Sequence, residues 1–358
     1  YHNTTNPLEQ KIMEIKMGNN FINIVDNYLN RQISKIKFND IIVDDEILLT
    51  KEEVINDFNK TYFKYKPFRR IEKIIENVIN KYRNTHLKKA KNYTSKIRKC
   101  ITYENDIKKI MLEMYYENEF LNDVKTNYQI DINDFQSFTI SDELKYYDAI
   151  IYLYIKAKLL GLNSQFNKKY VIVDEAQDYN LMQYYLIKEY YTNAKMTILG
   201  DPNQAISKMV DYDNMDSIKE IIGGKNKLLK LETTYRSSYE ITKFCNEVLG
   251  LTSVNMINRH GDTVKVINKD NLQEQLTTLV NQSFEDGFGS VAILTDNLKS
   301  ASKIKKLINI DNKKLYILPI YEAKGLEFDS VIVIDNNINK KLYYVACTRA
   351  LHRLNIIK

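Results

Sequence analysis

The residues best suited to chemistry in this 358-residue sequence are two adjacent carboxylates, Asp174 and Glu175, which directly follow the short apolar run 170–173. In parallel sheets, ligands collect at the carboxyl ends of the strands. An aspartate there can hold Mg²⁺, and a neighbouring glutamate can take a proton from a water molecule that attacks a phosphate. The same pair could simply cap the next helix, so it does not establish a catalytic site by itself.

A second strand end carries another polar group. The apolar run 196–199 is followed by the sequence Gly-Asp-Pro-Asn-Gln, which ends at Gln204. Because a right-handed βαβ unit places successive parallel strands side by side, we expect Gln204 near Asp174 and Glu175, where it could sense a γ-phosphate. Alone, Gly-Asp-Pro-Asn is an ordinary turn sequence.

Three further segments carry residues that suit a nucleotide. Tyr235 offers a ring for stacking on a base, and Arg236 offers a guanidinium for phosphate. Gly325 allows close backbone approach, and Glu327 can accept a hydrogen bond from a ribose hydroxyl. We expect a helix to display Arg349, which could neutralise charge on a transferred phosphoryl group. Each segment alone is also explained as a surface turn or a surface charge.

The surrounding elements predict an α/β fold with parallel sheets, preceded by a largely helical part. Residues from about 8 to 130 show apolar positions at helical spacing without a βαβ rhythm, and Thr50 with Glu53 fits a capping box that starts a helix. Strands are expected at 170–173 and 196–199. A second series of strands is expected at 264–267, 291–294, 315–318, 331–334 and 354–357.

The bulk composition restricts the functional classes. The length and the 44% hydrophobic content fit two or three folded domains, and the net charge of +6 permits a polyanionic partner without requiring one. The segment 81–99 is rich in cations and could meet phosphates or an acidic protein groove, although a plain solvated helix face is the favoured explanation. Three cysteines without metal-ligand spacing indicate a reducing setting, and no apolar run could span a membrane, so we expect a cytoplasmic protein.

Taken in order, the five segments resemble motifs II to VI of the UvrD-like superfamily 1 helicases, over roughly residues 170–358. The resemblance implies P-loop NTPase (RecA-like) domains that use ATP and Mg²⁺. It implies a Mg²⁺ site at Asp174 and Glu175, water activation by Glu175, γ-phosphate coupling by Gln204, adenine stacking by Tyr235, γ-phosphate contact by Arg236, nucleotide contact at Gly325, ribose binding by Glu327 and an arginine finger at Arg349.

A narrower resemblance is to the HelD branch of these helicases. It rests on residues 199–206, 321–329 and 346–352, with Tyr321 where UvrD relatives usually have His. The helical segment around Thr50 looks like the arm that HelD proteins insert into their first RecA-like domain, and those arms grip RNA polymerase. The resemblance therefore implies a helical arm at 1–140, the C-terminal part of the first RecA-like domain at 141–225 and the second RecA-like domain at 226–358.

The phosphate-gripping loop of this family, Gly-x-x-x-x-Gly-Lys-Ser/Thr, does not occur in the sequence. We therefore expect this chain to be a C-terminal portion of a longer ATPase and to be inactive alone. We also expect it to be a monomer. Three hypotheses stay open: part of a HelD-like translocase that releases RNA polymerase from nucleic acid, part of a UvrD-type DNA repair helicase, or a non-catalytic RNA polymerase-binding module. DNA, single-stranded or duplex, is the expected nucleic acid.

Overall fold

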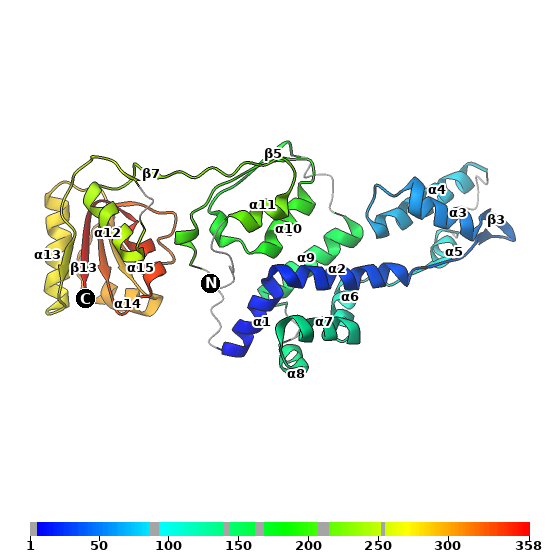
Figure 1. Ribbon diagram of the computed structural model, residues 1–358, viewed down its shortest axis with the longest axis horizontal. Helices are drawn as coiled ribbons and strands as arrows, with labels where there is room; N and C mark the ends of the chain where they lie inside the picture. Colours follow the sequence, from blue (N-terminus) through cyan, green and yellow to red (C-terminus); the bar gives the residue numbers. More distant parts are fainter. Residues whose placement is uncertain (1–5, 86–92, 139–143, 162–167, 207–214, 252–254) are drawn as a thin grey trace. The chain divides into compact units, whose positions relative to one another are not determined.

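The computed structural model describes residues 6–85, 93–138, 144–161, 168–206, 215–251 and 255–358 (Figure 1). The chain forms two compact units. Unit 1 consists of Tyr1–Gly200 and Ser207–Asn226, and unit 2 consists of Asp201–Ile206 and Lys227–Lys358. The three-part division with boundaries near 140 and 225 stays a prediction, and it did not anticipate that Asp201–Ile206 belongs with the C-terminal residues.

The first part of unit 1 is mostly helical, as the sequence predicts. Its helices are α1 (Pro7–Met17), α2 (Asn19–Ser34), α3 (Lys51–Asn56), the π-helical turn η1 (Asp57–Thr61), α4 (Pro67–Thr85), α5 (Tyr93–Lys99), α6 (Ile107–Met114), α7 (Asn118–Tyr128), α8 (Ile132–Gln136) and α9 (Tyr146–Leu160). The predicted capping box is confirmed: Glu53 N donates to Thr50 Oγ1 at 3.3 Å, and Thr50 N donates to Glu53 Oε2 at 2.8 Å.

This largely helical region also contains short strands, which the sequence analysis did not predict. β1 (Lys37–Phe38) pairs antiparallel with β4 (Ile101–Thr102), and β2 (Ile41–Val43) pairs antiparallel with β3 (Glu46–Leu49). Asp44 and Asp45 join β2 to β3 with φ angles of 48° and 64°, the left-handed backbone that a tight hairpin turn requires. Strands of two to four residues are too short to show a clear alternating pattern.

A buried ion pair lies within the helical core of unit 1. Lys16 Nζ of α1 lies 2.8 Å from Asp148 Oδ1 of α9, and both side chains are completely buried. Tyr115 OH donates to the same oxygen at 2.9 Å, and the Lys16 ammonium lies 4.4 Å from the centre of the Tyr115 ring. Burial lowers the pKa of Lys16, and the attraction of Asp148 opposes that shift. The pair ties α1 to α9, because separating them would leave a charge in the core.

The second part of unit 1 is an α/β segment. β5 (Tyr170–Val173) and β6 (Lys195–Ile198) are parallel neighbours, from Tyr170 opposite Lys195 to Val173 opposite Ile198. This pairing confirms the strands predicted there. The remaining elements are the 3₁₀ turn η3 (Ala176–Asp178), α10 (Leu181–Tyr190) and α11 (Asp216–Ile222).

Unit 2 is built on a five-stranded sheet with the order β11-β10-β12-β13-β9, in which every pair is parallel. Its strands are β9 (Lys265–Ile267), β10 (Val291–Thr295), β11 (Leu315–Pro319), β12 (Phe328–Ile334) and β13 (Ala350–Ile357). All five strands of the predicted second series are therefore confirmed. The short strands β7 (Thr233–Thr234) and β8 (Asn255–Met256) form a separate parallel pair, and η4 (Pro202–Gln204) is a 3₁₀ turn.

Helices cover both faces of this sheet. α12 (Tyr239–Leu249) and α15 (Lys340–Cys347) pack with Ala292 and Leu294 of β10. α13 (Leu272–Glu285) and α14 (Leu298–Leu307) pack with Val291 and Ile293 of the same strand. Successive residues of a strand point to opposite faces, so β10 is buried on both sides, as is usual in parallel sheets. Within the described residues, none of the helices has the length and apolar character needed to cross a bilayer.

Replacing Asp148 with alanine should destabilise unit 1 strongly, because Lys16 would keep a buried charge without its partner. We expect a loss of about 3–5 kcal/mol, measured as faster hydrogen exchange of the α1 and α9 amides. The control is Glu76→Ala, since Glu76 pairs with Lys73 at the surface and should contribute at most about 1 kcal/mol. Equal effects of the two substitutions would contradict the importance of the buried pair.

Candidate functional site

Asp174 and Glu175 stand immediately after β5, at its carboxyl end, as the sequence predicts. The Glu175 N–H donates to Asp174 Oδ1 at 2.8 Å, and Gln177 Nε2 donates to Glu175 Oε2 at 2.6 Å. Glu175 has φ 51° and ψ 42°, the left-handed region that residues other than glycine rarely adopt. Holding such a conformation costs on the order of 1–3 kcal/mol, and such residues cluster at functional sites. The backbone thus supports a special role for Glu175.

The turn after β5 packs closely against the end of β6. Ala176 N donates to Leu199 O at 2.8 Å. A Cβ added to Gly200 would lie 2.7 Å from Gln177 Oε1 and 2.8 Å from Ala176 Cβ. Only glycine therefore allows this approach, which fixes the Asp174–Glu175 turn against the neighbouring strand.

The carboxylate of Asp174 fits a magnesium ion that arrives with a nucleotide. Asp174 is exposed, and carboxylate oxygens are preferred ligands of Mg²⁺. Among the described residues, no group of three or more His, Cys, Asp or Glu side chains could hold a metal. Mg²⁺ is commonly bound through one or two carboxylates with the remaining positions filled by phosphate and water.

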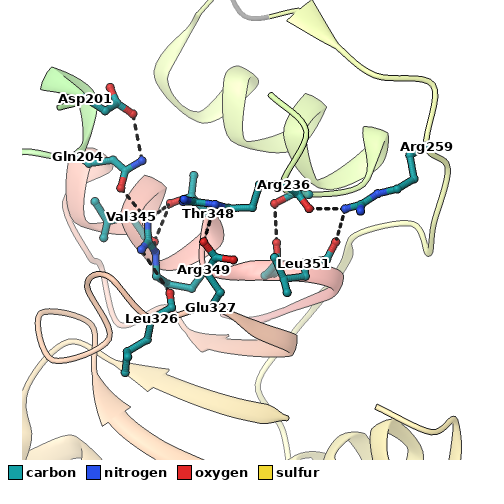
Figure 2. Close-up of polar contacts among 12 residues, drawn as sticks. Asp201, Gln204, Arg236, Arg259, Leu326, Glu327, Val345, Thr348, Arg349 and Leu351 are labelled. Atoms are coloured by element: carbon teal, nitrogen blue, oxygen red, sulfur yellow. Dashed lines mark hydrogen bonds and ion pairs between the residues drawn. The ribbon is translucent and has the colours of Figure 1, made fainter. Parts of the chain in front are cut away.

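In unit 2, the Arg349 guanidinium is the centre of a hydrogen-bond network (Figure 2). Its side chain donates from Nη2 to Gln204 Oε1 at 2.7 Å, from Nε to Val345 O at 3.1 Å and from Nη1 to Leu326 O at 3.4 Å. Nη2 also lies 3.2 Å from Thr348 Oγ1. Arg349 is only 1% exposed. Because a buried guanidinium needs its donors satisfied, the network accounts for how this charge is tolerated in the fold.

The expectation that a helix displays Arg349 was wrong. α15 ends at Cys347, and β13 begins at Ala350, which pairs with Phe328 of β12. The chain must change from helix to strand within two residues, and Arg349 lies in that turn. Its side chain therefore points inward along the end of α15, towards Val345 O, rather than outward from a helix face.

Gln204 is held by its backbone as well as by its side chain. Lys324 Nζ donates to Gln204 O at 2.9 Å, and Gln204 Nε2 donates to Asp201 Oδ2 at 3.1 Å. Asp201 also caps the η4 turn by accepting from Asn203 N at 2.9 Å. Sequence reasoning assigned no role to Lys324, although it stands directly before Gly325 in a segment singled out for nucleotide binding. The position of Lys324 in that segment could have indicated that it belongs to the site.

Arg236 and Glu327 form an ion pair at the same site, with Arg236 Nε 2.7 Å from Glu327 Oε1 (Figure 2). Both side chains are partly exposed, so water reaches the pair. Arg259 donates to the carbonyl oxygen of Arg236, which fixes the backbone there. Tyr235 is 72% exposed, so its ring is accessible for stacking, and Gly325 has φ 75° with no atom near an added Cβ.

The loop that carries Arg259 is attached to the start of α12. Glu240 lies 2.7 Å from His260 Nδ1 and accepts from Gly261 N at 2.8 Å. The hydrogen bond with His260 and the Gly261 N–H lower the pKa of Glu240 to about 2. The carboxylate therefore stays ionised across the neutral range and keeps the loop in place.

The structure thus brings Gln204, Arg236, Glu327 and Arg349 together in unit 2, with Tyr235 and Gly325 in the same segments. Asp174 and Glu175 lie in unit 1 and hydrogen-bond to each other.

Comparison of the sequence with known protein families shows which family the chain belongs to. The UvrD/REP helicase N-terminal domain matches residues 5–209, more than half of the chain. The chain belongs to the UvrD/REP family of superfamily 1 helicases. The viral superfamily 1 RNA helicase core domain also matches, over residues 152–358.

Curated relatives of this UvrD/REP chain carry helicase names. A protein described as a candidate ATP-dependent DNA helicase of Acanthamoeba polyphaga mimivirus is 25% identical over 52% of this chain and 34% of its own length. The ATP-dependent DNA helicase srs2 of Schizosaccharomyces pombe is 33% identical over 23% of this chain and 10% of its own. A DNA helicase II homolog of Rickettsia conorii is 28% identical over 36% and 20%. The chain spans about a third or less of these relatives.

Two helicases are among the solved structures that are similar to the chain. The C-terminal domain of a possible DNA helicase from Lactobacillus plantarum is 26% identical, with a TM-score of 0.29 over 35% of this chain and 86% of that one. An arterivirus nonstructural protein 10 helicase, solved with DNA, is 15% identical, with a TM-score of 0.32 over 53% and 40%. TM-scores this low do not by themselves establish a shared fold.

Replacing Gln204 with alanine should destabilise unit 2, because the buried Nη2 of Arg349 would lose the nearer of its two acceptors. We expect a loss of about 1–3 kcal/mol, measured as faster hydrogen exchange of the β12 and β13 amides. The matched control is Asn203→Ala, because only the backbone of Asn203 takes part in the turn bond to Asp201. Equal exchange rates of the β12 and β13 amides in the two variants would show that the Gln204 side chain does not stabilise unit 2.

Proposed function

We propose that this chain is an ATP-responsive portion of a superfamily 1 helicase motor. The observation that carries the proposal is the network in which Arg349 binds the side chain of Gln204 while Lys324 binds its backbone. Gln204, Lys324 and Arg349 come from three separate segments, and the sequence analysis singled out each segment for nucleotide contact, although it gave Lys324 itself no role. Their contacts support a common site in which a phosphate would be sensed by all three segments together.

In this proposal each side chain has one task. Asp174, with Glu175 beside it, holds Mg²⁺, which supplies charge neutralisation for the phosphates when it is bound. Glu175 takes a proton from the attacking water, and Tyr235 stacks on the adenine. The contacts to ATP are completed by Gln204, Arg236 and Arg349 at the γ-phosphate and by Glu327 at the ribose, while Gly325 allows close backbone approach to the nucleotide.

Arg349 and Arg236 are both already bound to acceptors within the chain. A bound phosphate could therefore change the partners of these two arginines. Arg349 donates to Gln204 Oε1, and Arg236 pairs with Glu327. A phosphate oxygen is a strong acceptor for guanidinium and can replace either partner. We infer that ATP binding exchanges these internal acceptors for phosphate oxygens and thereby frees Gln204 and Glu327 for their own contacts with the nucleotide.

The sequence contains no phosphate-gripping loop. We therefore expect the chain alone to hydrolyse ATP at a negligible rate. That loop supplies backbone N–H groups, a lysine for the β- and γ-phosphates and a hydroxyl for Mg²⁺. Arg236 and Arg349 cannot replace these groups, because neither supplies the ligand that completes the Mg²⁺ site. Hydrolysis therefore requires a protein that also contains the loop.

The purified chain should release phosphate from Mg²⁺-ATP at the rate of a blank. In a full-length parent that contains the loop, Glu175→Gln should lower kcat by about 10²–10⁴-fold, since a general base contributes that much. The control is Glu220→Gln, which removes an exposed carboxylate of α11 in the same unit. Robust turnover by the chain itself, abolished by Glu175→Gln, would refute its assigned inactivity.

We further propose a HelD-like role in which the helical part of unit 1 docks on RNA polymerase. The β2–β3 hairpin supports a protein contact, because Ile42 and Ile47 are direct cross-strand partners with exposures of 45% and 56%. Exposed apolar pairs of this kind are suited to a protein interface. The alternative is a UvrD-type DNA repair helicase, and the DNA helicase names of the curated relatives support DNA as the nucleic acid in that case.

A pull-down separates the two proposals. Wild-type chain should capture core RNA polymerase at low salt, and the variant Ile42→Ser with Ile47→Ser should capture at least about tenfold less, because the apolar contact is lost. The control, Val266→Ser with Tyr316→Ser, removes exposed apolar side chains from unit 2. Absence of capture, together with unwinding of a tailed duplex by the full-length parent, would favour the UvrD-type role. Capture by a full-length parent that hydrolyses no ATP would favour a non-catalytic binding module.

A further inference from the structure

The side chain of Arg259 connects two stretches of backbone that are far apart in the sequence (Figure 2). Its Nη2 donates to the carbonyl oxygen of Arg236, shortly before α12, and lies 3.4 Å from the carbonyl oxygen of Leu351, in β13. One stretch carries Arg236, and the other directly follows Arg349. Arg259 therefore contacts both segments that bear an arginine proposed to bind the γ-phosphate.

The same two stretches are also joined to each other directly. Ser237 Oγ donates to Ala350 O at 2.6 Å, and Ser238 N donates to Leu351 O at 3.2 Å. Both serines are buried, so water competes little for these hydrogen bonds. The two proposed phosphate-binding arginines each stand one residue before this junction. A displacement of one arginine's backbone is therefore passed to the backbone beside the other.

Arg259 is itself held by the elements around it. Tyr239 N, at the start of α12, donates to Arg259 O at 2.8 Å. Two residues further along, a Cβ added to Gly261 would lie 3.0 Å from Ser238 Cβ, so the loop packs closely against the start of α12. A side chain on a fixed backbone can hold its partners at a fixed distance, which is what a supporting residue of a functional site requires.

A purely stabilising role does not account for these contacts well. The buried Nε of Arg259 has no hydrogen-bond partner in the part of the chain that the structure describes, and an unmatched buried donor costs free energy. Arg353, which anchors the same loop, instead pairs with two carboxylates, those of Asp262 and Asp286. Arg259 leaves one donor unmatched and directs another at two backbone carbonyls beside the candidate site.

We propose that Arg259 is a positioning residue that keeps Arg236 and Arg349 in one fixed relation, so that both guanidiniums reach the same γ-phosphate. This role rests on the proposed function of the site, because it requires both arginines to bind that phosphate. Small displacements of groups that act on one reacting centre have large effects, so losing the bridge weakens the contacts to the γ-phosphate. ADP has no γ-phosphate, and its affinity does not depend on the bridge.

The test uses a full-length parent that contains the phosphate-gripping loop and measures Kd for Mg²⁺-ADP and for the Mg²⁺ complex of AMP-PNP, a non-hydrolysable ATP analogue. Arg259→Ala should raise Kd for AMP-PNP about tenfold, as for one lost hydrogen bond to a charged group, and Kd for ADP by less than about twofold. Arg259→Lys keeps a cationic donor and should return Kd for AMP-PNP to within about threefold of the wild type. General damage to the fold would instead raise both Kd values together.

The matched control is Arg353→Ala, which removes an arginine that anchors the same loop through Asp262 rather than through Arg236. Its ratio of the two Kd values should equal that of the wild type. The proposal is overturned if Arg259→Ala leaves the ratio unchanged, if it raises both Kd values equally, or if the control changes the ratio as much.

The variant Arg236→Ala separates this role from the proposed function. If Arg236→Ala raises Kd for AMP-PNP selectively and Arg259→Ala does not, only the positioning role of Arg259 fails. If neither variant changes the ratio of the two Kd values, the γ-phosphate contact proposed for Arg236 fails as well.

Discussion

The arrangement of unit 2 depends on one constraint, the need to satisfy a buried guanidinium. Arg349 is out of contact with water, so each donor that lacks a partner would cost on the order of 1–3 kcal/mol or more. The carbonyl of Val345 at the end of α15, the carbonyl of Leu326 before β12 and the side chain of Gln204 meet this need. The constraint also explains why Asp201–Ile206 belongs to unit 2, although it directly follows the last residue of a unit 1 segment.

The two arginines of the candidate site differ in how easily they can change partners. Arg236 pairs with Glu327 where water has access, so the strength of that pair is reduced by solvent. Arg349 holds Gln204 in a water-excluded setting, where a hydrogen bond to a charged group is stronger. A ligand would therefore displace Glu327 from Arg236 at a lower free-energy cost than it would displace Gln204 from Arg349. We expect the exchange at Arg236 to come first.

Much of the fold follows from patterns that the sequence shows directly. The strands of unit 2 were predictable because buried parallel strands are continuous apolar runs, as in Val291–Thr295. The capping box at Thr50 was predictable because it depends on residues three apart. The hairpin at Asp44 and the burial of Arg349 were not predictable. The hairpin depends on left-handed aspartates, and the burial of Arg349 depends in part on Gln204, which lies 145 positions away in the chain. The roles assigned to the site residues stay predictions.

The left-handed backbone of Glu175 has a consequence for how this protein can change. Glycine at this position would relieve the unfavourable φ angle, so the variant could gain folding stability, although it would lose the carboxylate. Stability and chemistry are therefore opposed at a single residue. A search for more stable variants by thermal selection alone would favour losing the side chain proposed to activate water, whereas joint selection for turnover would retain it.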